Sequence, residues 1–185
     1  RTVATHALNI FGDHSDVYAC RQTGFAMLCE TNPQEVMDLS PVAHLAALEG
    51  KVPFINFFDG FRTSHEIQKI EKWDYEDLKE MCPMDAVEEF RNHALNPEHP
   101  TMRGSHENGD IFFQHREACN SVYDALPAVV EKYMNKINEK LGTNYGLFNY
   151  YGAPDADRVI IAMGSINDVA EEVIDYLTAK GEKVG

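Results

Sequence analysis

Two acidic residues and a histidine lie close together near the start of the chain and are the first side chains that could do chemistry. Asp13, His14 and Asp16 follow Gly12 in one short polar stretch. Carboxylates and imidazoles can bind a metal ion, move protons or contact a substrate. A metal site, an active-site loop and a surface turn all stay open on pattern alone. The metal site is the weakest of the three, because one histidine with an Asp-x-x-Asp pair supplies few ligands and no rigid frame.

A second polar group follows an apolar run further along the chain. Asp59, Arg62 and His65 come directly after the continuous apolar segment 52–58. In open α/β sheets, ligands bind at the carboxyl ends of the strands, and neighbouring parallel strands share that edge. The apolar segment 2–10 leads into the Gly12 loop in the same way, so we expect both loops to face one crevice.

Three arginines are candidates for holding a carboxylate, because the planar guanidinium group can donate two parallel hydrogen bonds to it. They are Arg1, Arg21 and Arg62. Taken one at a time, each is more often a member of a surface ion pair. The residues alone therefore leave the substrate-binding role open.

The elements that must position these loops read as alternating helix and strand. Residues 33–50 have the periodicity of an amphipathic helix that begins at Pro33 and ends at Gly50, with a kink or break expected at Pro41. A buried strand over 52–60 follows directly. This alternation predicts an α/β fold with a mostly parallel sheet and flanking helices.

The rest of the chain gives a less regular pattern. We expect a helix that begins at Thr63 or Ser64, a long loop over 91–121, and an amphipathic helix over 121–141. A linker with a domain boundary at 145–156 precedes a buried strand over 157–165. A helix closed by Gly181 follows, and the last three residues resemble the beginning of another strand. Both ends then suggest a piece of a larger polypeptide.

Composition limits the kinds of partner. The chain has 185 residues, 44% of them apolar, which is enough for one good core. Its 16 basic and 30 acidic residues give a net charge of −14, which argues against binding to nucleic acid or to an anionic membrane surface. We find no apolar run long enough to span a membrane.

The cysteines predict neither a zinc site nor an iron–sulfur cluster within this segment. Cys20, Cys29, Cys82 and Cys119 are irregularly spaced and form no C-x-x-C pair. We expect unpaired, buried thiols in the reducing cytoplasm. The sequence also lacks a glycine-rich phosphate loop, a nucleophile elbow and a Gly-Asp-Gly diphosphate motif. Pattern and composition therefore reach no further than an α/β protein with a polar crevice.

Several long and unusual strings carry a resemblance to a known family. They are THALNIFGDHSDVYACRQTGFAML, VPFINFFDGFRTSHEIQKIE, ALNPEHPTMRG, YYGAPDADRVIIAMGS and AKGEKVG. Together they resemble the single-chain pyruvate:ferredoxin (flavodoxin) oxidoreductases over essentially all 185 residues. The resemblance implies that the loop around Asp13 and His14 forms part of the wall of a thiamin diphosphate site and is not a metal site.

The resemblance also implies a fold and a domain division. Residues 1–145 correspond to the later part of a thiamin-diphosphate-binding pyrimidine module. Residues 146–185 correspond to the start of a second domain that is similar to the transketolase C-terminal domain.

Enzymes of this family convert pyruvate and coenzyme A to acetyl-CoA and carbon dioxide, and pass electrons through [4Fe-4S] clusters to ferredoxin or flavodoxin. By resemblance, Arg1 matches the arginine that binds the pyruvate carboxylate. Asp13 and His14 are candidates for an active-site loop. Arg62 and His65 are weaker candidates that could equally shape a homodimer contact.

The resemblance also implies that other functional parts of the enzyme lie outside this segment. The glutamate that activates thiamin is expected upstream of Arg1. The Mg²⁺-diphosphate motif, the coenzyme A domain and the cluster cysteines are expected downstream. The segment alone is therefore expected to bind no cofactor completely and to be inactive. Two alternatives stay open: another 2-oxoacid:ferredoxin oxidoreductase, for example one for 2-oxoglutarate, or a non-catalytic α/β binding or assembly module.

Overall fold

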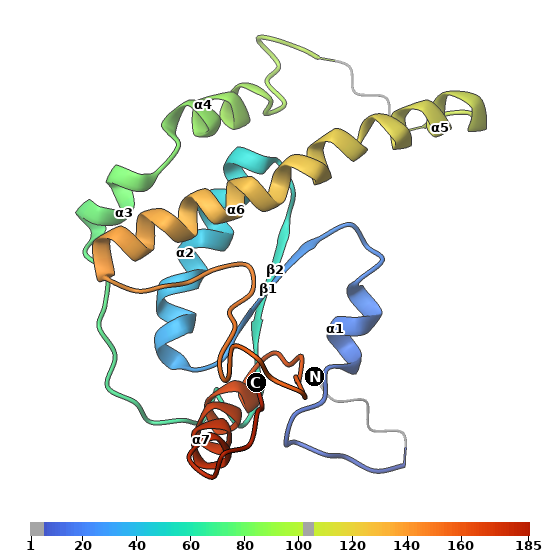
Figure 1. Ribbon diagram of the computed structural model, residues 1–185. Helices are drawn as coiled ribbons and strands as arrows, with labels where there is room; N and C mark the ends of the chain where they lie inside the picture. Colours follow the sequence, from blue (N-terminus) through green and yellow to red (C-terminus); the bar gives the residue numbers. More distant parts are fainter. Residues whose placement is uncertain (1–5, 102–105) are drawn as a thin grey trace.

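The computed structural model describes residues 6–101 and 106–185. Figure 1 shows two neighbouring strands with helices around them, and a long helix, α6, that crosses α2. Along the chain, the elements of the described part are α1 (Ser15–Cys20), β1 (Ala26–Glu30), α2 (Pro33–Gly50), β2 (Phe54–Phe58), α3 (Tyr75–Met81), α4 (Met84–Asn92), α5 (Gly109–Ala118), α6 (Asn120–Leu141) and α7 (Ile166–Thr178).

The two strands are parallel and α2 connects them. Ala26 pairs with Phe54 at one end of the ladder, and Glu30 pairs with Phe58 at the other. Successive side chains of a strand point to opposite faces. The face that includes Asn56 lies against α2, because its side-chain amide donates to Oγ of Ser40 at 2.9 Å. The predicted α/β fold with a parallel sheet is confirmed.

Helix α2 begins where its sequence predicts. The side chain of Asn32 accepts a hydrogen bond from the backbone N–H of Glu35 at 3.0 Å, and the Glu35 carboxylate accepts one from the N–H of Thr31 at 2.6 Å. Pro33 occupies the first turn, where a missing N–H costs nothing. The helix continues through Pro41, so the predicted break at that proline is wrong.

The other end of α2 depends on a glycine for a different reason than expected. The left-handed conformation that ends the helix belongs to Lys51, with φ of 54°. Gly50 instead allows α2 and α6 to approach closely: a Cβ atom at this position would lie 2.5 Å from Cδ1 of Leu126. A larger residue at position 50 would therefore require the Leu126 side chain to shift.

The hydrophobic core lies where α2, α6 and the α2-facing side of the sheet meet. Its fully or nearly buried members come mainly from α2 and α6: Leu39, Val42, Leu45, Ala46, Val52, Met81, Leu126, Val130, Tyr133, Met134 and Ile137. Burial of these side chains is the main favourable term in the folding of the region.

Three expectations about helices in the described segments need correction. No helix begins at Thr63 or Ser64; turns and an irregular segment lead to α3. The hydroxyl group of Thr63 donates to the carbonyl of Thr31 at 2.9 Å instead of capping a helix. The expected loop over 91–121 contains α5, and the polar stretch after Gly12 turns into α1 at Ser15.

The C-terminal segment differs most from expectation. Residues 157–165 do not form a buried strand: Ile160 and Ile161 are exposed, and pairing is limited to an isolated parallel bridge between Arg158 and Val184. Helix α7 is confirmed. It ends at Thr178, three residues before the predicted cap; Gly181 lies in the turn that follows, where its N–H donates to the carbonyl of Thr178 at 2.9 Å. The domain boundary at 145–156 and the likeness to a transketolase domain stay predictions.

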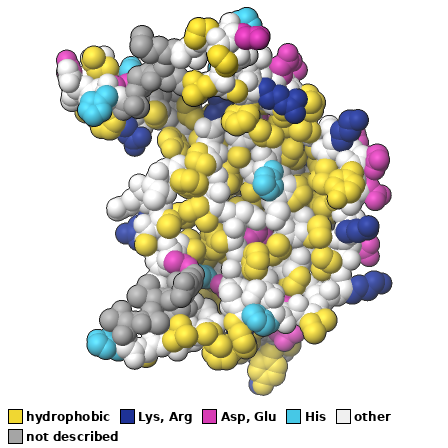
Figure 2. All heavy atoms as spheres, turned by 180° about the vertical axis from the view of Figure 1, so that it is seen from behind, with side chains coloured by type: hydrophobic (Ala, Val, Ile, Leu, Met, Phe, Trp, Pro, Cys, Tyr) yellow, Lys and Arg dark blue, Asp and Glu magenta, His cyan; other side chains and the backbone are white. Residues whose placement is uncertain are grey.

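The surface carries many apolar side chains. Figure 2 shows them spread across one broad face, with lysine, arginine, aspartate and glutamate gathered mainly along one edge. Exposed large examples include Ile111, Phe112 and Phe113 of α5. Extensive exposed apolar surface of this kind is typical of regions that contact other protein.

Candidate functional site

The carboxyl edge of the sheet brings three distant segments together around one carboxylate. Asp59 directly follows β2 and is 7% exposed. One of its oxygens lies 2.5 Å from Nε2 of His14. The other accepts hydrogen bonds from the backbone N–H of Ser165 at 2.8 Å and from its hydroxyl group at 2.6 Å. Asp59 therefore joins the Gly12 loop to the start of α7.

These contacts keep Asp59 ionised. Burial by itself would raise the pKa of this carboxyl, but hydrogen bonds from Ser165 and His14, together with the nearby imidazole, outweigh burial and lower the pKa below its ordinary value. The carboxylate also lies at the amino end of α7, where the helix dipole favours a negative charge.

A glycine makes the close approach of α7 possible. Gly164 has φ of +82°, a conformation that side chains other than glycine rarely adopt. A Cβ atom on Gly164 would also lie 2.8 Å from a carboxylate oxygen of Asp59. The turn before α7 is thus fitted to the Asp59 side chain.

A second acidic residue at this edge was not predicted. Glu30, the last residue of β1, is fully buried, and neither carboxylate oxygen has a hydrogen-bond partner among the described residues. Asp38 is almost as deeply buried, yet it accepts hydrogen bonds from Gln34 and Tyr145. Burial raises the pKa of Glu30 from 4.5 to about 8. Glu30 is therefore mostly protonated near neutral pH and can donate a hydrogen bond.

The sequence contained a signal for Glu30. The run from Phe25 to Cys29 lies between Gly24 and the Asn32-Pro33 helix start, which is the pattern of a buried strand before a helix. From the sequence alone, we instead expect the first strand over 2–10, directly before the Gly12 loop. No strand is found over 6–10, and residues 1–5 lie outside the described residues.

The predicted active-site residues differ in what the structure shows of them. Arg1 lies outside the described residues. His14 reaches Asp59, as described above. Asp13 is exposed and turns back to the start of α1, where Oδ1 accepts a hydrogen bond from the N–H of Ser15 at 2.8 Å. Hydrogen bonds from the side chain and backbone of Ser15 lower the pKa of Asp13.

Arg62 and His65 belong to an aromatic cluster beside this edge. The rings of Phe11 and Phe61 meet edge to face, with centroids 4.9 Å apart. The Arg62 guanidinium lies over the Phe11 ring at 5.1 Å, and the His65 ring lies 5.0 Å from that of Phe61. The two loops predicted to share one edge do meet there. Arg62 and His65 have no recorded contact with Asp59.

The described residues offer no metal-binding group. None of their clusters contains three or more histidine, cysteine, aspartate or glutamate side chains placed to hold an ion. All four cysteines are free, and they are half-buried rather than buried as expected. Burial, followed by the charges of Glu30 and Asp59, raises the pKa of Cys29 to about 12. Its thiol is therefore a poor nucleophile.

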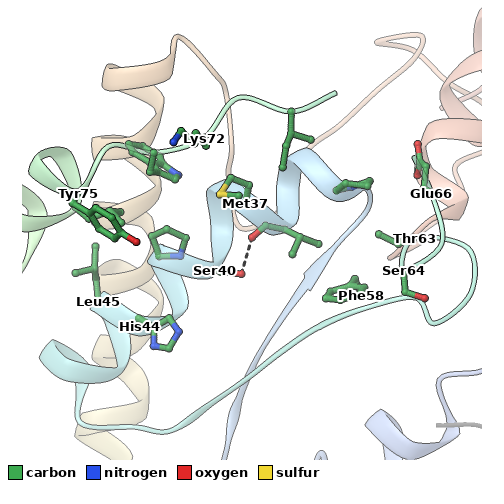
Figure 3. A pocket seen from close by; sticks show the side chains of 16 residues that line it. Met37, Ser40, His44, Leu45, Phe58, Thr63, Ser64, Glu66, Lys72 and Tyr75 are labelled. Carbon is green, nitrogen blue, oxygen red and sulfur yellow. Dashed lines mark hydrogen bonds between the residues drawn. The ribbon is translucent and has the colours of Figure 1, made fainter. Parts of the chain in front are cut away.

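A mostly apolar cavity lies elsewhere in the described part of the chain. It has a volume of about 940 Å³ and is bounded by α2 and by the irregular segment that follows β2. Figure 3 shows Met37, Ser40 and His44 on one wall, with Thr63 and Ser64 at one end. Asp13, His14, Arg62 and His65 do not line it. Because the cavity is mostly apolar and lacks paired titratable groups, we place the candidate site at the sheet edge.

Comparison with known proteins places the chain in a family. Residues 1–135 match the family described as "Pyruvate flavodoxin/ferredoxin oxidoreductase, thiamine diP-bdg". The whole chain is 62% identical to a pyruvate-flavodoxin oxidoreductase of Enterobacter agglomerans and 57% identical to a pyruvate:ferredoxin oxidoreductase of Moorella thermoacetica. It is 50% identical to a "Pyruvate dehydrogenase [NADP(+)]" of Cryptosporidium parvum.

The chain spans 16% of the length of the first two relatives and 10% of the third. Within the described residues, no helix is long and apolar enough to cross a membrane. The match over residues 1–135 covers most of the chain and agrees with the parallel α/β fold. The chain therefore belongs to the thiamin-diphosphate-binding family of the pyruvate flavodoxin/ferredoxin oxidoreductases.

Proposed function

We propose that this chain is the part of a pyruvate oxidoreductase that helps to form the site where pyruvate meets thiamin diphosphate. The whole enzyme would convert pyruvate and coenzyme A to acetyl-CoA and carbon dioxide, with electrons passed to ferredoxin or flavodoxin. The observation that carries the proposal is identity of 50–62% along the entire chain with relatives whose names share pyruvate.

The names of these relatives differ in the electron acceptor. They specify flavodoxin, ferredoxin or NADP⁺, although all three proteins share this segment. This supports a role of the segment in handling pyruvate and leaves the choice of acceptor to other regions. It also favours pyruvate over 2-oxoglutarate as the substrate.

The chain's own contribution would be binding and orientation. By resemblance, the Arg1 guanidinium holds the pyruvate carboxylate through two hydrogen bonds, which its planar geometry suits. His14 would contact the bound substrate or cofactor from an orientation fixed by Asp59. Asp13 is a weaker candidate, because its carboxylate already accepts a hydrogen bond from the N–H of Ser15. Arg62 and His65 would support the loop through their ring contacts.

By resemblance, this chain would supply only part of the thiamin diphosphate site. When bound, the cofactor supplies the carbanion chemistry of decarboxylation, and its diphosphate requires a cation such as Mg²⁺. The described residues include no metal-binding group for that cation. From the resemblance, we assign Mg²⁺, the [4Fe-4S] clusters and the coenzyme A site to the remainder of the longer enzyme.

Contacts with that remainder, and with a second copy in a homodimer, would cover exposed apolar side chains such as those of α5. The net charge of −14 supports an enzyme that binds neither nucleic acid nor membranes. The free thiols support a cytoplasmic location.

The test of the proposed function is the variant Arg1→Ala in the full-length enzyme. Loss of one hydrogen bond between charged groups costs about 1.5–3 kcal/mol, which corresponds to a fall of about 10- to 150-fold in kcat/KM for pyruvate. Arg158→Ala is the matched control, because it removes only an exposed ion pair with Glu182.

Steady-state pyruvate oxidation with a dye acceptor measures both variants. Unchanged kinetics in Arg1→Ala would exclude the carboxylate role. A purified native polypeptide that binds no thiamin diphosphate would favour the non-catalytic module instead.

A further inference from the structure

We infer that Asp59 is a positioning residue for His14: it fixes the imidazole so that Nδ1 is the ring atom available to accept a hydrogen bond or proton from a ligand. The inference deepens the proposed function and rests on it. The ligand class is a small molecule that carries an O–H or N–H group beside the pyruvate site.

The contact with Asp59 determines which nitrogen of the His14 ring carries the hydrogen. An ionised carboxylate can only accept hydrogen bonds, so the 2.5 Å contact requires that Nε2 of His14 carry the hydrogen. In the neutral ring, the lone pair then lies on Nδ1. A carboxylate at this position thus selects one tautomer and fixes the orientation of the ring, as partners of functional histidines commonly do.

Neighbouring groups hold Asp59 and His14 in place. Asp59 cannot turn away from His14 without losing two hydrogen bonds to Ser165, and the backbone of Gly164 packs against the same carboxylate. The side chain of Asp59 is only 6% exposed. The ring of Phe57 lies edge-on to the His14 ring, with centroids 6.2 Å apart. The pair is therefore held from several sides.

A second histidine–carboxylate pair in this chain shows the contrast. His115 and Glu107 lie 2.6 Å apart, but their side chains are 64% and 27% exposed. No further recorded hydrogen bond from the described residues holds this Glu107 carboxylate. A pair of this kind can separate in water at little cost. His115 and Glu107 therefore provide a matched control for His14 and Asp59.

The other ring nitrogen of His14, Nδ1, is accessible to a ligand. No recorded hydrogen bond from the described part of the chain reaches Nδ1 of His14, although the ring is only 25% exposed. The carboxylates of Asp59 and Asp13 both interact electrostatically with the His14 ring. A partly buried base beside fixed negative charge is suited to accept a hydrogen bond from a small ligand.

The experiment uses the full-length enzyme loaded with its cofactors. Asp59→Asn, His14→Gln and the double variant are compared in pyruvate oxidation. We expect each single variant to lower kcat/KM by about 10- to 100-fold, the usual cost of losing such an orienting partner. If Asp59 acts through His14, the double variant is no worse than His14→Gln alone. Glu107→Gln should retain wild-type kinetics.

A readout that does not depend on turnover accompanies the kinetics. Modification of histidines with diethyl pyrocarbonate is followed by peptide mass spectrometry, with and without pyruvate and in the absence of an electron acceptor. Pyruvate itself carries no O–H or N–H group at neutral pH, but pyruvate bound beside His14 should shield the ring. It should therefore slow modification of His14 and leave that of His115 unchanged. This measurement also applies if Asp59→Asn fails to fold.

The possible outcomes distinguish an error in the positioning role of Asp59 from an error in the proposed function. Additive losses in the double variant, wild-type kinetics in His14→Gln, or no protection of His14 by pyruvate would each overturn the inference while wild-type pyruvate oxidation persists. If the wild-type full-length enzyme does not oxidise pyruvate, the proposed function itself is wrong.

Discussion

Helices α2 and α6 contribute most of the buried apolar side chains, whereas no residue of α7 is buried. The side-chain contacts that join the start of α7 to the sheet edge are polar. Ser165 donates to Asp59, Asn167 donates to Thr31 at 3.1 Å, and the amide of Asn32 donates to Asp168 at 3.3 Å. The two regions are therefore stabilised by different forces.

These two kinds of contact affect different properties: the stability of the fold and the arrangement of the carboxyl edge of the sheet. Apolar burial is non-directional and supplies most of the free energy of folding. Hydrogen bonds add about 0.5–1.5 kcal/mol each, but they fix orientation. The α2–α6 region should therefore determine whether the chain folds. The polar contacts of α7 should determine how the carboxyl edge of the sheet is arranged.

The largest expected effect is in the α2–α6 core. Ile137 is fully buried, so Ile137→Ala should lower the free energy of unfolding by about 2–5 kcal/mol through lost burial and a cavity. Ile160 is 74% exposed in the C-terminal segment, and Ile160→Ala should change stability by less than about 0.5 kcal/mol. Urea denaturation of the chain measures both variants. Equal effects would show that the two regions share one core.

The sequence predicted the elements whose signals are local. The start of α2 was predicted because Asn32 and Pro33 are neighbours, and β2 because it lies within the apolar segment 52–58. The strand is half-buried, however, and not buried as expected. By contrast, the conformation around Thr63 depends on a contact with a residue that is distant in the sequence. The Thr63 hydroxyl donates to Thr31, 32 residues earlier, and no window around residue 63 contains that information.

Only part of the candidate site could be predicted from the sequence, for the same reason. The rule that ligands bind at the carboxyl ends of strands led to Asp59. The first strand was assigned to the wrong apolar segment, so Glu30 was missed. The contact of His14 with Asp59 spans 45 residues and depends on how α1 and β2 pack. Only the tertiary structure could supply it.

A pH-dependent effect is expected from the buried carboxyl of Glu30, at the end of β1. Its pKa is raised from 4.5 to about 8 in the folded chain. Between these values, the unfolded chain releases the proton while the folded chain keeps it. Stability must then fall as pH rises through this window, by up to about 5 kcal/mol in total.

The variant Glu30→Gln removes this titration and keeps the shape of the side chain. It should be more stable than the parent chain at pH 8 and about equally stable at pH 4. Glu131→Gln is the control, because Glu131 is exposed and should cause no such pH-dependent difference. Urea denaturation at the two pH values measures the effect. A constant difference between Glu30→Gln and the parent would show that Glu30 has a partner in the folded chain.

The smallest effect should be confined to α7. Asn167→Ala removes the hydrogen bond from the side-chain amide to Oγ of Thr31, and should cost about 0.5–1.5 kcal/mol. Because α7 contributes no buried side chain, the cost should appear as local opening. Hydrogen exchange should become faster over residues 166–170 and stay unchanged in α6. If exchange in α6 also becomes faster, α7 is coupled to the core, and its polar contacts stabilise the fold as well as the arrangement of the edge.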